Sequence, residues 1–153
     1  MYEALNLLGE SYYVALPLVA AYLLYRRKKT FWALLLSIAL ALVIVTVMKM
    51  AILEPRPCVG AASPIGCDDP LQSFPSRHAA VLATALVFLL PEAPLFVAYL
   101  AYFILICFTR VYLGQHYLHD VIAGAAIGLA IGYCCLKSAP CLNGALRKLS
   151  GKR

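Results

Sequence analysis

The sequence predicts an all-α integral membrane protein, a bundle of five or six transmembrane helices that forms a single domain over residues 1–153. Two observations carry this prediction. The chain is 63% hydrophobic and 13% charged, with a mean hydropathy of +0.84, whereas soluble domains are usually about 45–50% apolar and about 25% charged. The apolar residues are also gathered into five runs. A soluble globular domain and a disordered chain are both excluded.

The five apolar runs differ in length. They cover Leu5–Tyr25, Phe31–Leu53, Ala79–Leu90, Pro94–Phe108 and Leu118–Leu136. A bilayer core of about 30 Å needs about 20 helical residues. The third run is too short on its own, so it must borrow residues from 75–78 or be covered by protein at its outer end. Proline-rich segment 54–77 predicts a loop, and Pro91–Pro94 predicts a tight turn. A sixth, interfacial helix over 139–149 stays open.

Basic residues predict the orientation in the cell membrane. The first run carries Glu3 and Glu10 but no preceding Lys or Arg, and residues 26–29 after it are all basic. This pattern is typical of a retained span with its N-terminus outside, and not of a signal peptide. Alternation of the spans then puts the C-terminus in the cytoplasm. Nine of the thirteen Lys and Arg residues fall on the cytoplasmic side, as the positive-inside rule requires.

The other four basic residues fall on the outer side, together with two histidines and an aspartate. The set is Lys49, Arg56, Arg77, Arg110, His78, His116 and Asp120. Any one cation alone is explained by snorkelling to lipid headgroups, but seven such residues at one boundary indicate a site for an anionic ligand. Multiply charged phosphate suits Arg and Lys side chains. This placement favours a membrane phosphate ligand and argues against nucleic acid as the reason for the net charge of +6.

Three motifs in this region resemble a known family. They are Lys49-x6-Arg56-Pro57, Phe74-Pro75-Ser76-Arg77-His78 and Arg110-x5-His116-x3-Asp120. Their order and spacing are similar to the three signatures of the type 2 phosphatidic acid phosphatase (PAP2) superfamily, over roughly residues 45–135. Two positions depart from the family pattern, because Arg77 replaces the usual Gly and Thr109 the usual Ser. The first departure bears on substrate preference, and the second keeps the hydroxyl group.

The resemblance implies a metal-free and cofactor-free phosphoryl transfer, and the residue chemistry agrees. His116 and Asp120 are four apart, so a carboxylate can orient an imidazole whose other nitrogen attacks phosphorus to form a phosphohistidine. His78, at the start of the third span, is the expected general acid. The expected phosphate-binding residues are Lys49, Arg56, Ser76, Arg77 and Arg110, with Ser76 at a helix start that favours anions.

We expect the substrate to be a polyprenyl diphosphate of the undecaprenyl or dolichyl type, hydrolysed to the monophosphate, because Arg77 offers a cation for a second phosphate. Alternatives are phosphatidic acid, a phosphatidylglycerophosphate-type lipid and a lipid A-type phosphate. From another class, a non-enzymatic lipid-phosphate binder or transporter stays open. The expected partners are this lipid substrate, bilayer lipids and a second copy in a homodimer. A vanadate-dependent haloperoxidase is disfavoured because those proteins are large and soluble.

His119 offers a competing interpretation of the site. With His116 and Asp120 it supplies three metal-ligand side chains. A metal-dependent phosphohydrolase would want more carboxylates than this side of the chain provides, so an interfacial role for His119 is favoured.

Two further patterns bear on structure. Gly124, Gly128 and Gly132 recur every four residues in the fifth run, which permits close helix packing within the chain, against the alanines of the third run, or in a dimer. Cys58 and Cys67 lie nine apart in the outer loop. In an oxidising compartment they can pair and restrain the loop that carries Arg56, and free thiols remain the alternative.

Overall fold

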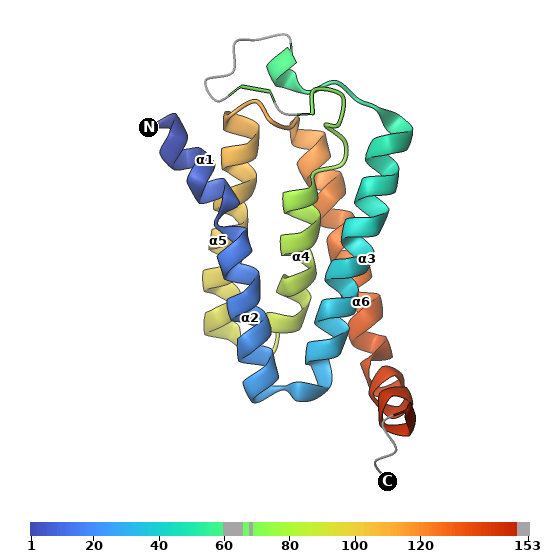
Figure 1. Ribbon diagram of the computed structural model, residues 1–153. Helices are drawn as coiled ribbons and strands as arrows, with labels where there is room; N and C mark the ends of the chain where they lie inside the picture. Colours follow the sequence, from blue (N-terminus) through green and yellow to red (C-terminus); the bar gives the residue numbers. More distant parts are fainter. Residues whose placement is uncertain (60–65, 68, 150–153) are drawn as a thin grey trace.

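The computed structural model describes residues 1–59, 66–67 and 69–149 as a bundle of helices, without strands in these ranges. In chain order the elements are α1 (Tyr2–Glu10), α2 (Tyr12–Arg26), α3 (Lys28–Ile52), the short 3-10 helix η1 (Pro57–Val59), α4 (Arg77–Leu89), α5 (Ala93–Tyr112) and α6 (Leu118–Leu149). Figure 1 shows α4 in the middle of the bundle, among the other long helices. The predicted all-α class is confirmed.

Four helical segments are long and apolar enough to cross a membrane. They are Tyr2–Arg26, Thr30–Ile52, Ala93–Tyr112 and Leu118–Ala139. The fifth, α4, has only 13 residues. Both features expected for such a short run, added residues at its start and a cover of protein, are present. The helix begins at Arg77, ahead of the apolar run, and every residue from His78 to Leu89 is buried. Residues 139–149 extend α6, so they do not form a separate sixth helix.

The first apolar run is divided, although the sequence predicts one uninterrupted span. α1 and α2 meet at Ser11, and α1 leans away from the direction of α2 in Figure 1. The Ser11 hydroxyl donates to the carbonyl of Leu8 at 2.6 Å and lies 2.7 Å from the hydroxyl of Tyr102. A serine side chain that binds nearby backbone competes with regular helix formation. Because of this break, α1 takes a direction of its own relative to α2.

The glycine stripe of α6 packs against α4. A methyl group built on Gly128 would overlap the backbone of Ala80, and one built on Gly124 would overlap the carbonyl of Ser76. Gly132 faces Thr84 in the same way. Because the two backbones approach this closely, the stripe is used inside the chain, as the alternative with the third-run alanines predicts.

The two ends of the bundle carry different connections. The N-terminus, the segment between α3 and α4, and the α5–α6 connection lie at one end (Figure 1). The α2–α3 turn, the α4–α5 turn and the C-terminal end of α6 lie at the other. At that second end Arg27 and Glu92 form an ion pair of 3.4 Å between the two turns. The basic residues Lys152 and Arg153, predicted to be cytoplasmic, lie outside the described residues.

Candidate active site

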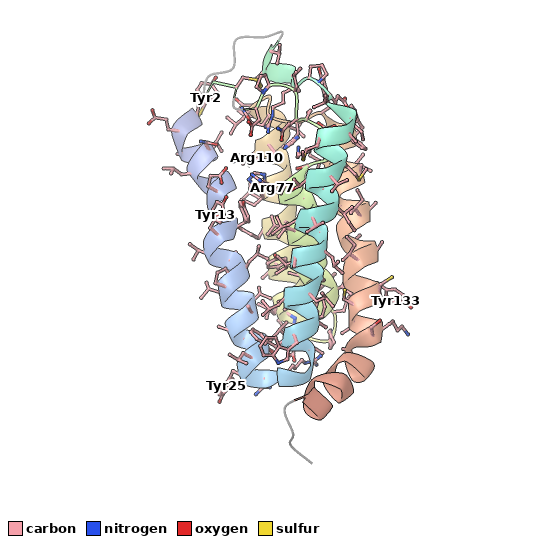
Figure 2. The ribbon with its side chains drawn as sticks, turned by 45° about the vertical axis from the view of Figure 1, so that its right-hand side comes forward. Tyr2, Tyr13, Tyr25, Arg77, Arg110 and Tyr133 are labelled. Carbon is pink, nitrogen blue, oxygen red and sulfur yellow. A yellow bond between two sulfur atoms is a disulfide. The ribbon has the colours of Figure 1, made fainter. Side chains whose placement is uncertain are left out.

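A polar pocket lies at the end of the bundle that carries the α3–α4 segment. Its lining side chains are Lys49, Arg56, Asp69, Gln72, Arg77, His78, Arg110, Gln115 and His116. Figure 2 labels Arg77 and Arg110 at this level, beneath the connecting loop. Six of the eight site residues expected from the sequence therefore line one pocket. The other two, Ser76 and Asp120, are fully buried and do not line it.

His116 and Asp120 form the most enclosed pair at the site. His116 Nδ1 lies 3.4 Å from Asp120 Oδ2, and the side chains are 3% and 0% exposed. The same carboxylate oxygen accepts a hydrogen bond from the Ser73 hydroxyl at 2.5 Å and one from the Tyr117 amide at 2.8 Å. These two donors fix the carboxylate, which in turn holds the Nδ1 edge of the imidazole. The Nε2 atom of His116 is then the nitrogen left for chemistry.

The environment of His116 keeps its imidazole neutral. Burial lowers the pKa of His116 from 6.5 to about 4, and the nearby cations Lys49 and Arg56 act in the same direction. The Asp120 carboxylate opposes this shift without cancelling it. A neutral imidazole has the lone pair that a nucleophile needs.

The start of α4 positions Ser76 and His78. The Ser76 hydroxyl caps the helix by accepting a hydrogen bond from the Ala79 amide at 3.4 Å. The Ser76 amide donates to the Asp120 carbonyl at 3.0 Å, which ties α4 to α6 beside the pocket. Ser76 therefore makes structural contacts here, whereas the next turn of helix brings His78 to the pocket wall.

Lys49 and Arg56 anchor the α3–α4 segment as well as line the pocket. Lys49 Nζ donates to the carbonyls of Gln72 and Ser73. Arg56 Nε donates to the Asp69 carbonyl at 3.1 Å, and its NH1 donates to the side-chain oxygen of Gln115 at 3.0 Å. Both cations hold backbone or amide oxygens in place while they face the pocket.

Arg110 is held from the side of α1. Its NH1 lies 3.1 Å from Glu10 Oε1, and its NH2 donates to the Asn6 carbonyl at 3.0 Å. The same Glu10 oxygen lies 3.4 Å from His78 Nε2. The Nε atom of Arg110 is buried without a hydrogen-bond partner among the described residues. Both terminal nitrogens of the guanidinium group are thus held by α1.

A disulfide restrains the loop beside the pocket. Cys58 and Cys67 are bonded, with their Cα atoms 5.6 Å apart, which answers the question that the sequence left open. The Cys58 amide also donates to the Gly114 carbonyl at 3.0 Å, and Gln115 Nε2 donates to the Gly66 carbonyl at 3.1 Å. The disulfide loop is therefore attached directly to the segment that carries His116.

His119 lies outside the pocket, among carboxylates. Its Nε2 is 2.8 Å from Glu54 Oε1 and 3.1 Å from Asp120 Oδ1. Ligand atoms of these three residues all lie within 4.8 Å of one another, so the group has the composition of a metal site. The third member of this group is Glu54, and not His116 as the sequence suggests. The His119 side chain is 57% exposed, and its two close carboxylates also suffice to explain its position.

Sequence reasoning missed three residues that touch the site. Ser73 and Gln115 hold Asp120 and Arg56, and no motif marks them. Glu10 does carry a signal, because an ionisable residue inside an apolar span is a functional candidate by default. In the sequence, Glu10 serves only as evidence that the first apolar run is a span.

The fold and the pocket define a multi-pass helical membrane protein with a pocket lined by cationic side chains at one end of the bundle. The sequence profile of the PAP2 superfamily matches residues 30–141, so this chain belongs to the PAP2 superfamily. All three predicted motifs fall within the matched range.

Known proteins agree with this membership. The chain is 32% identical over 127 residues to an undecaprenyl-diphosphatase of Sulfolobus acidocaldarius, a match that covers 79% of this chain and 61% of the relative. The crystal structure of Aquifex aeolicus LpxE has a TM-score of 0.74 and 32% identity, covering 89% of this chain and 83% of that one. A PAP2-type phosphatidylglycerolphosphate phosphatase from Bacillus subtilis shares the fold, with a TM-score of 0.67 and 24% identity over 88% and 74% of the two chains.

Proposed function

We propose that this chain is a membrane lipid phosphatase that works through a phosphohistidine, without a metal or other cofactor. One observation carries the proposal. His116, backed by the fixed Asp120 carboxylate, faces a pocket that four cationic side chains line. Such a pocket stabilises charge on the oxygens of a transferring phosphoryl group.

The proposed reaction has two steps. His116 Nε2 attacks phosphorus, the bond between phosphorus and the leaving oxygen breaks, and His78 gives that oxygen a proton. A water molecule then attacks the phosphohistidine, His78 takes a proton from it, and the P–N bond breaks to release inorganic phosphate. Lys49, Arg56 and Arg110 face the phosphoryl oxygens, and Asp120 stabilises the positive charge on His116 during the transfer.

We infer that the substrate is a polyprenyl diphosphate of the undecaprenyl type, which is cleaved to the monophosphate. The name of the Sulfolobus relative supports this substrate class. Arg77 supports it independently, because this exposed side chain adds a cation to the pocket lining. Phosphatidic acid, a phosphatidylglycerophosphate-type lipid and a lipid A-type phosphate are the alternative substrates.

The proposed location is the cell membrane, with the pocket on the extracytoplasmic side. The distribution of Lys and Arg along the sequence supports this orientation. The disulfide beside the pocket supports it as well, since disulfides persist mainly in oxidising compartments.

The test is phosphate release from undecaprenyl diphosphate by detergent-purified protein in excess EDTA, with His116→Ala as the negative control. Activity that survives EDTA and is lost in the variant would support the proposal. Loss of activity in EDTA, restored by added metal, would instead favour the Glu54–His119–Asp120 group. A wild-type protein that binds undecaprenyl diphosphate and releases no phosphate from any lipid phosphate would favour the binder or transporter.

A panel of substrates tests the lipid class. Undecaprenyl diphosphate, phosphatidic acid, phosphatidylglycerophosphate and lipid A would be compared by kcat/KM, in wild type and in Arg77→Gly. We expect the variant to lose activity selectively on the diphosphate. An equal loss on every substrate would argue against a second-phosphate role for Arg77.

A further inference from the structure

We propose that Glu10 is a positioning residue of this site, which holds the Arg110 guanidinium and the His78 imidazole in place from behind the pocket wall. The inference rests on the proposed roles of Arg110 and His78 in the reaction. It adds α1, which precedes the region matched by the family profile, to the catalytic apparatus.

The contacts of one carboxylate oxygen carry the inference. Glu10 Oε1 lies 3.1 Å from Arg110 NH1 and 3.4 Å from His78 Nε2. Both of those side chains line the pocket, whereas Glu10 does not. Asp120 has the same relation to His116, because it also lies behind a lining histidine. A carboxylate in that place restricts its partners without occupying the position of the substrate.

The packing of α1 shows a second adaptation to Arg110. Gly9 is buried against the guanidinium, and a methyl group at this position would overlap it. The Asn6 carbonyl accepts from NH2 of the same group. Asn6, Gly9 and Glu10, which lie on one turn of α1, therefore surround the guanidinium group of Arg110.

Charge around His78 gives Glu10 a second effect. The groups that face His78 are Glu10 from α1, Tyr12 from α2, Arg110 from α5 and, from its own helix, Arg77. Glu10 is the anionic group among these. Removing its charge disfavours the protonated imidazole that a general acid requires.

The experiment compares Glu10→Gln and Glu10→Asp with wild type in the full-length protein in detergent. Glu3→Gln is the matched control, since it makes the same chemical change at an exposed position on the same helix. We expect Glu10→Gln to lower kcat/KM about 10–100-fold on whichever lipid phosphate the wild type hydrolyses. The alkaline limb of its pH–rate profile should move to lower pH. Glu10→Asp should recover part of the loss, and Glu3→Gln should match wild type.

Binding of orthovanadate, used as a phosphate analogue, separates the alternatives. Weaker vanadate inhibition in Glu10→Gln supports the inference. Stronger inhibition overturns it, because Glu10 would then compete with the phosphoryl group. A lower melting midpoint with unchanged kinetics also overturns it, because the role would be structural only. Arg110→Ala tests the proposed contact between Arg110 and phosphate. If vanadate inhibits this variant as strongly as wild type, Arg110 does not bind phosphate, whatever the role of Glu10.

Discussion

The site contains two pairs of a histidine and a carboxylate, and they are built differently. Asp120 lies four residues after His116, is fully buried, and is fixed by the Ser73 hydroxyl and the Tyr117 amide. Glu10 reaches His78 from a different helix, has a side chain that is 40% exposed, and divides its contacts between His78 and Arg110.

The two histidines are therefore positioned by different parts of the structure. The proposed nucleophile takes its geometry from local structure, because His116 lies just before α6 and its carboxylate, Asp120, lies in the first turn of that helix. The proposed general acid depends on how α1 docks against α5. Perturbations of the first helix should therefore affect protonation of the leaving group before they affect nucleophilic attack.

The largest expected effect separates the two histidines. His116→Ala should reduce kcat at least about 10³-fold on every substrate, because no phosphoenzyme can form. His78→Ala should cost about 10²–10⁴-fold on a lipid substrate but much less on p-nitrophenyl phosphate, whose leaving group needs no proton. Phosphate release from the two substrates measures this contrast. Equal losses on both substrates for His78→Ala would contradict its role as the acid.

The carboxylates should rank in the same order as their burial. Asp120→Asn should lower kcat about 10²–10⁴-fold, since an amide favours the wrong imidazole tautomer. The loss expected for Glu10→Gln is smaller because its carboxylate is shared and partly exposed. Parallel kcat and KM measurements on both variants give the ranking. A larger loss in Glu10→Gln than in Asp120→Asn would contradict this ranking of the two carboxylates.

The charge state of His116 depends on its burial and on Asp120. Because burial lowers its pKa to about 4, the imidazole should remain neutral from pH 7 down to about pH 5. Its protonated form should dominate only below about pH 4. NMR of ¹⁵N-histidine-labelled protein, with the signal assigned by its loss in His116→Ala, reads this directly. In Asp120→Asn the pKa should fall further, because the carboxylate that favours the charged form is gone. Protonation of His116 near pH 6.5 would contradict the described burial.

The smallest effect is expected at His119. Exposed ion pairs contribute about 0.2–1 kcal/mol, so His119→Ala should change kcat/KM by no more than about fivefold. EDTA should leave both wild type and the variant unchanged. A large loss in the variant together with sensitivity of the wild type to EDTA would identify a metal group outside the pocket, and both histidine–carboxylate pairs would need another interpretation.

Much of this organisation could be predicted from the sequence, because the physical signals are local. Apolar runs long enough to span a bilayer mark the helices. The four-residue spacing of His116 and Asp120 indicates that they meet, as they do, although α6 begins only at Leu118. The glycine repeat of α6 indicates close packing, and its partner α4 follows from the small residues Ala80 and Ala83. Cations at an outer boundary are costly enough to stand out as a ligand site.

The remaining features depend on contacts between distant segments. Nothing near Ser11 in the sequence shows that its hydroxyl meets Tyr102, so the break between α1 and α2 could not be read. Glu10 meets Arg110 only after α1 has docked on α5. The capping contact of Ser76 was likewise invisible, because a serine before a helix suits both an anion site and an N-cap.

The short length of α4 bears on how deep the proposed reaction lies in the bilayer. Its 13 residues extend over about 20 Å at 1.5 Å each, about 10 Å less than a hydrocarbon core of about 30 Å. Because its flanks are covered by protein, this helix escapes the hydrophobic mismatch that a lipid-facing helix of that length would suffer. Its far end lies at the turn into α5, opposite the pocket. With that far end at the cytoplasmic edge of the hydrocarbon layer, as the proposed orientation implies, His78 would lie about 10 Å beneath the outer edge. The proposed lipid substrate would then draw its phosphate below the headgroup plane to react.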